Sequence, residues 1–195
     1  PELSALSYWV RKSSISAIIK DFKIRILDGE VVVPRGVVFH IAPSNVDSIF
    51  MYSWALSLVV GNINIVRVSQ DHSLQMALLL EIIQKILKDK KFSNIAKRNK
   101  VITYPHEDKI SSGISKLSDV RVIWGGNETV DYFKDLPCPR TTKDIVFADK
   151  WSHSVIEAKK FNSLKQNERE GLSKKFYNDS YWFDQMACSS PRVVF

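Results

Sequence analysis

The chain has 195 residues, of which 45% are hydrophobic and 25% are charged, and its formal net charge is +7. This length is enough for one sizeable core. The two cysteines exclude a disulfide framework, and the longest apolar stretch, residues 49–60, is too short for a membrane span of about 20 residues. The surplus of basic residues favours an anionic partner, whether nucleic acid, a membrane surface or a phosphorylated small molecule.

Short β-branched runs alternate with longer amphipathic segments along the chain. The short runs predict strands over residues 36–42, 63–69, 100–105, 120–124 and 144–149, with an alternative in which the last strand continues through residues 152–157. The segments after them predict helices over residues 47–60, 72–89, 106–117, 125–136 and 164–180. The strand runs are continuously apolar, as expected when both faces of a sheet are covered. The order predicts an α/β fold, a doubly wound and mostly parallel sheet of about five strands.

Two details of these helices are also predictions. Asp47 is expected to cap the helix at residues 47–60, and Ser69 or Asp71 the helix at residues 72–89. The second of these helices carries an apolar stripe at helical spacing, formed by Leu74, Leu78, Ile82 and Ile86.

In a doubly wound sheet, ligands bind beyond the carboxyl ends of the strands, so the turns that follow the strands are candidate binding segments. Gly125 and Gly126 let the backbone approach a ligand closely, and Asn127 can cap a helix whose N-terminus favours anions. Asn45 can donate a hydrogen bond to an oxyanion, and Arg67 can hold a ribose or a phosphate. Each has a structural alternative: a tight connection, a turn asparagine and an exposed strand-end arginine.

The cysteines and histidines are less informative by themselves. Cys188 is either a nucleophile or an ordinary buried thiol, and Cys138, between two prolines, is interpreted as structural. The histidines show no metal-ligand spacing, so no metal site is predicted, and His40 is interpreted as a core residue with its polar atoms satisfied.

Four segments are more informative together than singly, because they occur in one chain in this order: PRGVVFHIAPSNV, LVVGNINIVRVS, RVIWGGNETV and DQMACSSPR. Together they resemble the LuxC-type acyl-CoA reductases, a branch of the aldehyde dehydrogenase superfamily, over nearly the whole chain. The resemblance implies a dinucleotide-binding α/β domain at residues 1–184 and the start of the catalytic domain at residues 185–195. The start at Pro1 also suggests a piece of a longer protein, expected to be inactive alone. The reducing environment inferred from cysteine usage predicts a cytoplasmic location.

The activity implied by the resemblance is reduction of an acyl thioester to an aldehyde through a cysteine thioester. Cys188 matches the acyl-accepting nucleophile, and Asn45 matches the oxyanion-hole asparagine of the superfamily. Phe147 or one of its neighbours stands where the superfamily brings a general-base glutamate. The absence of this glutamate fits an acyl reductase, which does not need a general base to activate water.

The resemblance also implies a nicotinamide cofactor. Arg67 stands where the superfamily usually has a lysine that binds the adenosine ribose, and Gln70 stands where NAD-preferring relatives often carry a glutamate. A neutral residue there permits NADPH, which we expect, with NADH as the alternative. The predicted cofactor-binding set is Ser44, Arg67, Ser69, Gln70, Gly125, Gly126 and Asn127.

The expected partner is an acyl-CoA or an acyl-donating enzyme. Nucleic acid and a membrane span are not expected, and the full-length form is expected to be a homo-oligomer. Two alternatives stay open: a reductase of phosphate-activated acyl groups, such as glutamyl phosphate reductase, or a non-catalytic basic module that binds nucleic acid or another protein.

Overall fold

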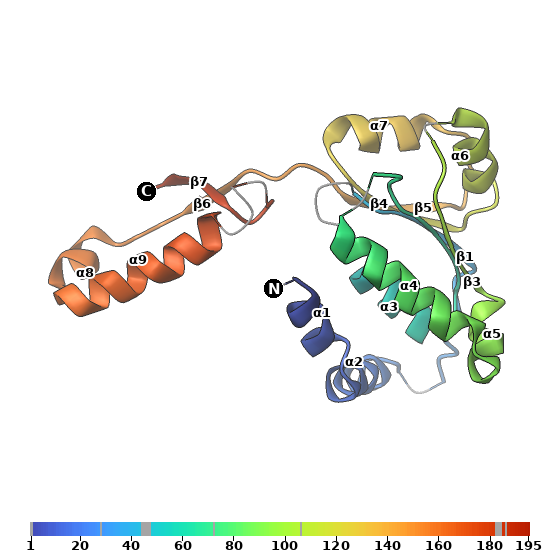
Figure 1. The fold of residues 1–195 in the computed structure, drawn as a ribbon, viewed down its shortest axis with the longest axis horizontal. Coiled ribbons are helices and arrows are strands. Elements are labelled where there is room, and N and C mark those ends of the chain that lie inside the picture. Colours follow the sequence, from blue (N-terminus) through green and yellow to red (C-terminus); the bar gives the residue numbers. More distant parts are fainter. Residues whose placement is uncertain are drawn as a thin grey trace. The chain divides into compact units, whose positions relative to one another are not determined.

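The computed structural model describes residues 2–27, 29–43, 48–71, 73–105, 107–181, 185 and 187–195. The chain divides into two compact units, Pro1–Ala148 and Asp149–Phe195, here called the sheet unit and the C-terminal unit (Figure 1). This division comes earlier in the chain than the predicted boundary after residue 184, which concerned domains of the family and stays a prediction.

In the described part of the sheet unit, five strands form one parallel sheet: β1 (Val37–Ile41), β2 (Ile63–Arg67), β3 (Asn99–Ile102), β4 (Val120–Trp124) and β5 (Lys143–Phe147). Their order is β3-β2-β1-β4-β5. The chain winds outward from β1 to β3 and then crosses to β4 on the other side of β1. The direction of winding therefore reverses between β1 and β4, where open α/β sheets bind ligands. The predicted fold class is confirmed.

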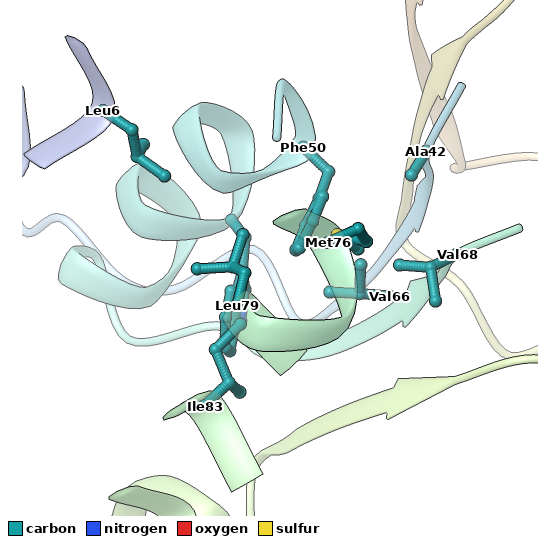
Figure 2. Packing of buried hydrophobic residues seen from close by; sticks show 9 residues of the cluster. Leu6, Ala42, Phe50, Val66, Val68, Met76, Leu79 and Ile83 are labelled. Carbon is teal, nitrogen blue, oxygen red and sulfur yellow. The ribbon is translucent and has the colours of Figure 1, made fainter. Parts of the chain in front are cut away.

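Helices cover both faces of this sheet (Figure 1). One face carries α3 (Phe50–Val59) and α4 (Leu74–Lys88), and the other carries α6 (Asp108–Ser115) and α7 (Asn127–Asp135). Successive strand residues point to opposite faces, so β1 sends Phe39 and Ile41 toward α7 while Ala42 packs on the α3 side. Figure 2 shows the core on that side, formed by Leu6, Ala42, Phe50, Trp54, Val66, Val68, Met76, Leu79 and Ile83.

The structure corrects two details of α4. The buried residues are Met76, Leu79 and Ile83, whereas the predicted stripe is exposed, with Leu74 79% accessible. The helix is apolar over most of its circumference, so the spacing of its apolar residues could not show which face packs on the sheet. Its cap is Ser73, whose Oγ accepts a hydrogen bond from the Met76 amide at 3.2 Å, and not Ser69 or Asp71. The predicted cap Asp47 lies outside the described residues.

Several elements were not predicted. The sheet unit begins with α1 (Glu2–Trp9) and α2 (Lys12–Ile24), and β3 is preceded by η1 (Lys90–Phe92) and α5 (Ser93–Ala96). Helix α1 contributes Leu6 to the core and places the Trp9 ring 4.6 Å from that of Tyr52 in α3. The elements η1 and α5 are too short to show a periodic pattern, and α2, η1 and α5 contain no buried residue.

The C-terminal unit contains β6 (Ser152–Ser154), α8 (Ala158–Ser163), α9 (Gln166–Tyr181) and β7 (Pro191–Val194). Strands β6 and β7 pair in parallel as a separate two-stranded sheet. The alternative that the fifth strand continues through residues 152–157 is therefore wrong, because β5 ends at Phe147 and β6 belongs to another sheet.

A polar network lies buried between β1, β2, β3 and α3. Nε2 of the fully buried His40 lies 3.1 Å from Asn64 Oδ1, and Asn64 Nδ2 donates to Asn99 Oδ1 at 2.9 Å. Because the Asn64 amide nitrogen is used as a donor, Nε2 of neutral His40 carries the proton. His40 Nδ1 lies 3.1 Å from the Ser53 hydroxyl, and Trp54 Nε1 donates to Asn99 Oδ1 at 2.8 Å. The interpretation of His40 as a satisfied core residue is confirmed.

A charged pair joins β4, β5 and α7 on the other face. The buried Arg121 donates from Nε and Nη2 to the two carboxylate oxygens of Asp144, both at 2.7 Å. Its Nη1 donates to the carbonyls of Phe133 and Leu136 at the end of α7, at 2.6 and 3.3 Å. Burial opposes the charge, but the hydrogen bonds and the charge of Asp144 raise the pKa of Arg121 on balance. The pair thus fastens the edge strand and the helix to β4.

We predict that Asp144→Asn lowers the free energy of unfolding by about 3 kcal/mol, because it leaves a buried guanidinium without its counter-charge. Urea unfolding measures this change. The control is Glu157→Gln, which removes the same charge from an exposed pair with Lys160 and should cost less than about 1 kcal/mol. Equal stabilities of the two variants would contradict the prediction.

We also predict that His40 makes stability depend on pH. Burial lowers the pKa of His40 from 6.5 to about 4, although the hydrogen bond with Asn64 opposes this shift. As the pH falls from about 6.5 toward 4, the unfolded chain binds a proton that the folded protein does not. The free energy of unfolding should therefore fall by roughly 3 kcal/mol over that window.

Urea unfolding between pH 7 and pH 4.5 checks this expectation. His40→Gln should be less stable than the wild type at pH 7 but should lose less stability on acidification. His153→Gln, at the exposed histidine of β6, is the control and should follow the wild type. A His40→Gln curve parallel to that of the wild type would show that His40 does not cause the effect.

Candidate active site

The turn after β4 lies where the winding of the sheet reverses. Gly125 donates its amide hydrogen to the Phe147 carbonyl at 3.2 Å, and a Cβ at this position would lie 2.9 Å from side-chain carbons of Thr129. Glycine therefore lets the turn pack closely against α7. Gly126 is the N-cap residue of α7 and Asn127 its first residue, which shifts the predicted cap by one position. The N-terminus of α7 thus begins directly at this turn.

An aromatic pair flanks the turn. Trp124 and Phe147 are partners in the β4–β5 register, and their rings stack with centroids 3.7 Å apart at 6°. Trp124 Nε1 donates to Ser53 Oγ at 3.4 Å, which connects the pair to His40 through the buried network. Sequence reasoning did not include Trp124 in the site, although two aromatic residues ending adjacent parallel strands were a usable signal.

Arg67 ends β2 on the same edge of the sheet. Its guanidinium lies over the ring of Tyr104, 5.0 Å from the centroid, and its buried Nε has no hydrogen-bond partner among the described residues. The Tyr104 hydroxyl lies 3.1 Å from Ser111 Oγ. Burial raises the pKa of Tyr104, while Ser111 and the Arg67 charge act in the opposite direction. The ring thus holds a cation that retains unused donor capacity. The alternative of a simple exposed arginine is not what the structure shows, because Arg67 is half-buried.

The remaining predicted cofactor residues follow the strand ends. Ser69 is half-buried and Gln70 exposed in the loop after β2, while Ser44 and Asn45 lie outside the described residues. Strands β2 and β4 both neighbour β1, so their carboxyl ends are two strand spacings, about 10 Å, apart. The structure therefore places Arg67 and the Gly125 turn at the same end of the sheet, the carboxyl ends of the strands, with β1 between them.

Cys188 lies in the C-terminal unit, in a tight turn before β7. The Ser190 amide donates to the Ala187 carbonyl at 3.0 Å, so Cys188 is the second residue of a β-turn. Its thiol is free and exposed, and its role as the nucleophile stays a prediction. Cys138 is also free and exposed, so exposure alone does not distinguish the two. What differs is the backbone, since Ser152 Oγ donates to the carbonyl of Cys188 at 2.6 Å.

The described residues lack two further features. They contain no group of three or more histidine, cysteine or acidic side chains that could hold a metal ion. No helix among them combines the length and the apolar composition needed to cross a membrane.

Solved aldehyde dehydrogenases share this fold. Aldehyde dehydrogenase 21 from Physcomitrella patens, in complex with succinate, matches with a TM-score of 0.62 and 13% identity over 83% of this chain and 32% of its own. The enzyme from Bartonella henselae gives 0.56 and 12%, covering 90% and 37%. The Mycobacterium tuberculosis enzyme, in complex with NAD+, gives 0.50 and 13%, covering 82% and 31%.

The chain thus spans about a third of the length of these solved structures. A comparison with curated proteins finds no match. The family model for acyl-CoA reductase (LuxC) matches residues 15–195, which is most of the chain, and the chain therefore belongs to the LuxC acyl-CoA reductase family.

Proposed function

We propose that this chain carries the cofactor-binding sheet and the nucleophile of an NADPH-dependent reductase that converts an acyl thioester to an aldehyde. The observation that carries the proposal is the free, exposed Cys188 at the second position of a closed β-turn, in a chain of the acyl-CoA reductase family. A thiol held in this way is accessible to an acyl carbonyl. The backbone around it is fixed by the hydrogen bond that closes the turn and by the bond from Ser152 to the Cys188 carbonyl.

The residues at the sheet edge suit a dinucleotide. The Gly125 turn leads directly into α7, whose N-cap is Gly126, so the first backbone N–H groups of this helix lie at the end of the sheet where such folds bind ligands. On the other side of β1, Arg67 has a buried donor without a partner among the described residues. We propose that Gly125, Gly126 and Asn127 hold the phosphates and that Arg67, Ser69 and Ser44 hold the adenosine ribose. When bound, the nicotinamide supplies the hydride that reduces the acyl group.

The preference for NADPH rests on the charge at the end of β2. Arg67 is held against Tyr104, and the exposed Gln70 follows three residues later with no charge. A 2′-phosphate can form a charge-assisted hydrogen bond with the guanidinium. A glutamate in place of Gln70 would repel that phosphate.

The acylation step follows from thiol chemistry. The Cys188 thiolate attacks the carbonyl carbon of the acyl thioester, a new C–S bond forms, and the thiolate of the donor leaves. We propose that Asn45, in the segment after β1, donates a hydrogen bond to the oxyanion that develops in this step. At the end of β5, Phe147 stacks on Trp124 and offers no general base for hydrolysing the acyl-enzyme. Release as an aldehyde is then favoured over hydrolysis to an acid.

We predict that the full-length enzyme forms a thioester on Cys188 when it is incubated with saturated acyl-CoA thioesters from acetyl to hexadecanoyl. Intact mass and peptide mapping detect the adduct. Cys188→Ala should abolish both acylation and aldehyde formation, because the attacking sulfur is gone. Cys138→Ala is the matched control, since both thiols are free and exposed, and it should be acylated at the wild-type rate.

Labelling that survives in Cys188→Ala and disappears in Cys138→Ala would refute the assignment. Acylation by acyl phosphates but not by acyl-CoA would favour a reductase of phosphate-activated substrates. Salt-sensitive binding of nucleic acid without acylation would favour a non-catalytic basic module.

We also predict that the full-length enzyme binds NADPH roughly tenfold to a hundredfold more tightly than NADH, because a hydrogen bond to a charged group contributes about 1.5–3 kcal/mol. Titration calorimetry measures both dissociation constants. Gln70→Glu should narrow or reverse the preference, whereas Gln84→Glu, the same change at an exposed position of α4, should leave it unchanged. Equal affinities for both cofactors in the wild type would exclude this role for Arg67.

A further inference from the structure

The turn that carries Cys188 leaves its central peptide outside its own hydrogen bond. The bond from the Ser190 amide to the Ala187 carbonyl closes the turn, and it uses neither the Cys188 carbonyl nor the Ser189 amide. In such a turn the central peptide, here between Cys188 and Ser189, can adopt two orientations that differ by a flip. The orientation of this peptide sets the backbone angle next to the nucleophile.

Ser152 binds this free carbonyl. Its hydroxyl donates to the Cys188 carbonyl at 2.6 Å, which is short for an O–H···O bond. Ser152 is paired with Pro191 in the β6–β7 sheet, three residues after Cys188 in the chain. This pairing places Ser152 beside the turn that carries the cysteine.

The position of Ser152 is itself fixed by the two-stranded sheet. After the register shift that follows Ser152, the Phe195 amide donates to the Ser154 carbonyl at 2.9 Å and the Ile156 amide to the Phe195 carbonyl at 2.8 Å. The rings of His153 and Phe195 meet edge to face at 5.6 Å. Ser152 thus reaches the turn from a strand that is held along its length.

We propose that Ser152 is a positioning residue for Cys188, which holds the 188–189 peptide in one orientation so that the thiol is aimed for acyl transfer; this inference rests on the proposed function. Ser189 does not have a positive φ, and a residue with a side chain disfavours the positive φ that the flipped turn would require at this position. The flipped orientation is therefore already disfavoured, and removal of the Ser152 hydroxyl should slow the reaction without abolishing it.

The test compares three variants of the full-length enzyme. Ser152→Ala removes the donor, Ser152→Thr keeps a hydroxyl on a residue suited to strands, and Ser154→Ala is the control. Ser154 is the same residue type on the same strand, is equally half-buried, and joins the ladder through its backbone. Single-turnover acylation of Cys188 by the best acyl-CoA of the wild type gives the rate constant. Alkylation of Cys188 by iodoacetamide and the melting temperature are measured on the same samples.

Ser152→Ala should lower the acylation rate constant roughly twofold to tenfold, which corresponds to the loss of one neutral hydrogen bond. Its alkylation rate should change less than twofold, because a small reagent needs no aligned thiol. Ser152→Thr should restore acylation, and Ser154→Ala should match the wild type in all three measurements.

Two results would overturn the positioning role while the proposed function stands. One is an acylation rate in Ser152→Ala equal to that of Ser154→Ala. The other is a parallel fall of acylation, alkylation and melting temperature in Ser152→Ala, which would mean that the hydroxyl only stabilises the β6–β7 sheet. A wild-type enzyme whose Cys188 is not acylated at all would instead refute the proposed function and this inference with it.

Discussion

The parallel pairing of β1 with both β2 and β4 is the constraint on which the rest of the sheet unit depends. Since β1 has a neighbour on each side and helices cover both faces of the sheet, every polar group on it must find a partner inside the protein. His40 meets this requirement through Asn64 and Ser53. The same pairing brings the ends of β2 and β4 to one edge, which is why Arg67 and the Gly125 turn are neighbours of a single strand.

The polar groups buried below the carboxyl ends of the strands stabilise the sheet and also hold the glycine turn after β4 in place. Trp124 stacks on Phe147 and donates to Ser53, which also lies next to His40. The last residue before the glycine turn is therefore tied to the helix on one face, while Arg121 and Asp144 tie β4 and β5 to α7 on the other. Both connections are formed from buried groups that are costly to leave unpaired, so they specify one arrangement of the turn.

The number of sheet strands and their positions in the sequence could be predicted, because each is a short β-branched run between turn signals. The inward face of α4 could not be predicted, because Leu74 and Met76 are both apolar and only the packing decides which is buried. The β6 segment could not be separated from β5 for a similar reason. Its partner, β7, lies more than thirty residues further along the chain, and no local pattern reports such a pairing.

The same limit applies to the candidate nucleophile. The sequence resemblance pointed to Cys188 as the nucleophile and Cys138 was interpreted as structural, but the structure leaves both thiols free and exposed. What sets Cys188 apart is a hydrogen bond to its carbonyl from Ser152, thirty-six residues earlier in the chain. An accessible thiol needs a defined direction before it can act as an acyl acceptor. In the role proposed for Ser152, that direction depends on the pairing of β6 with β7, which the residues beside the cysteine in the sequence do not report.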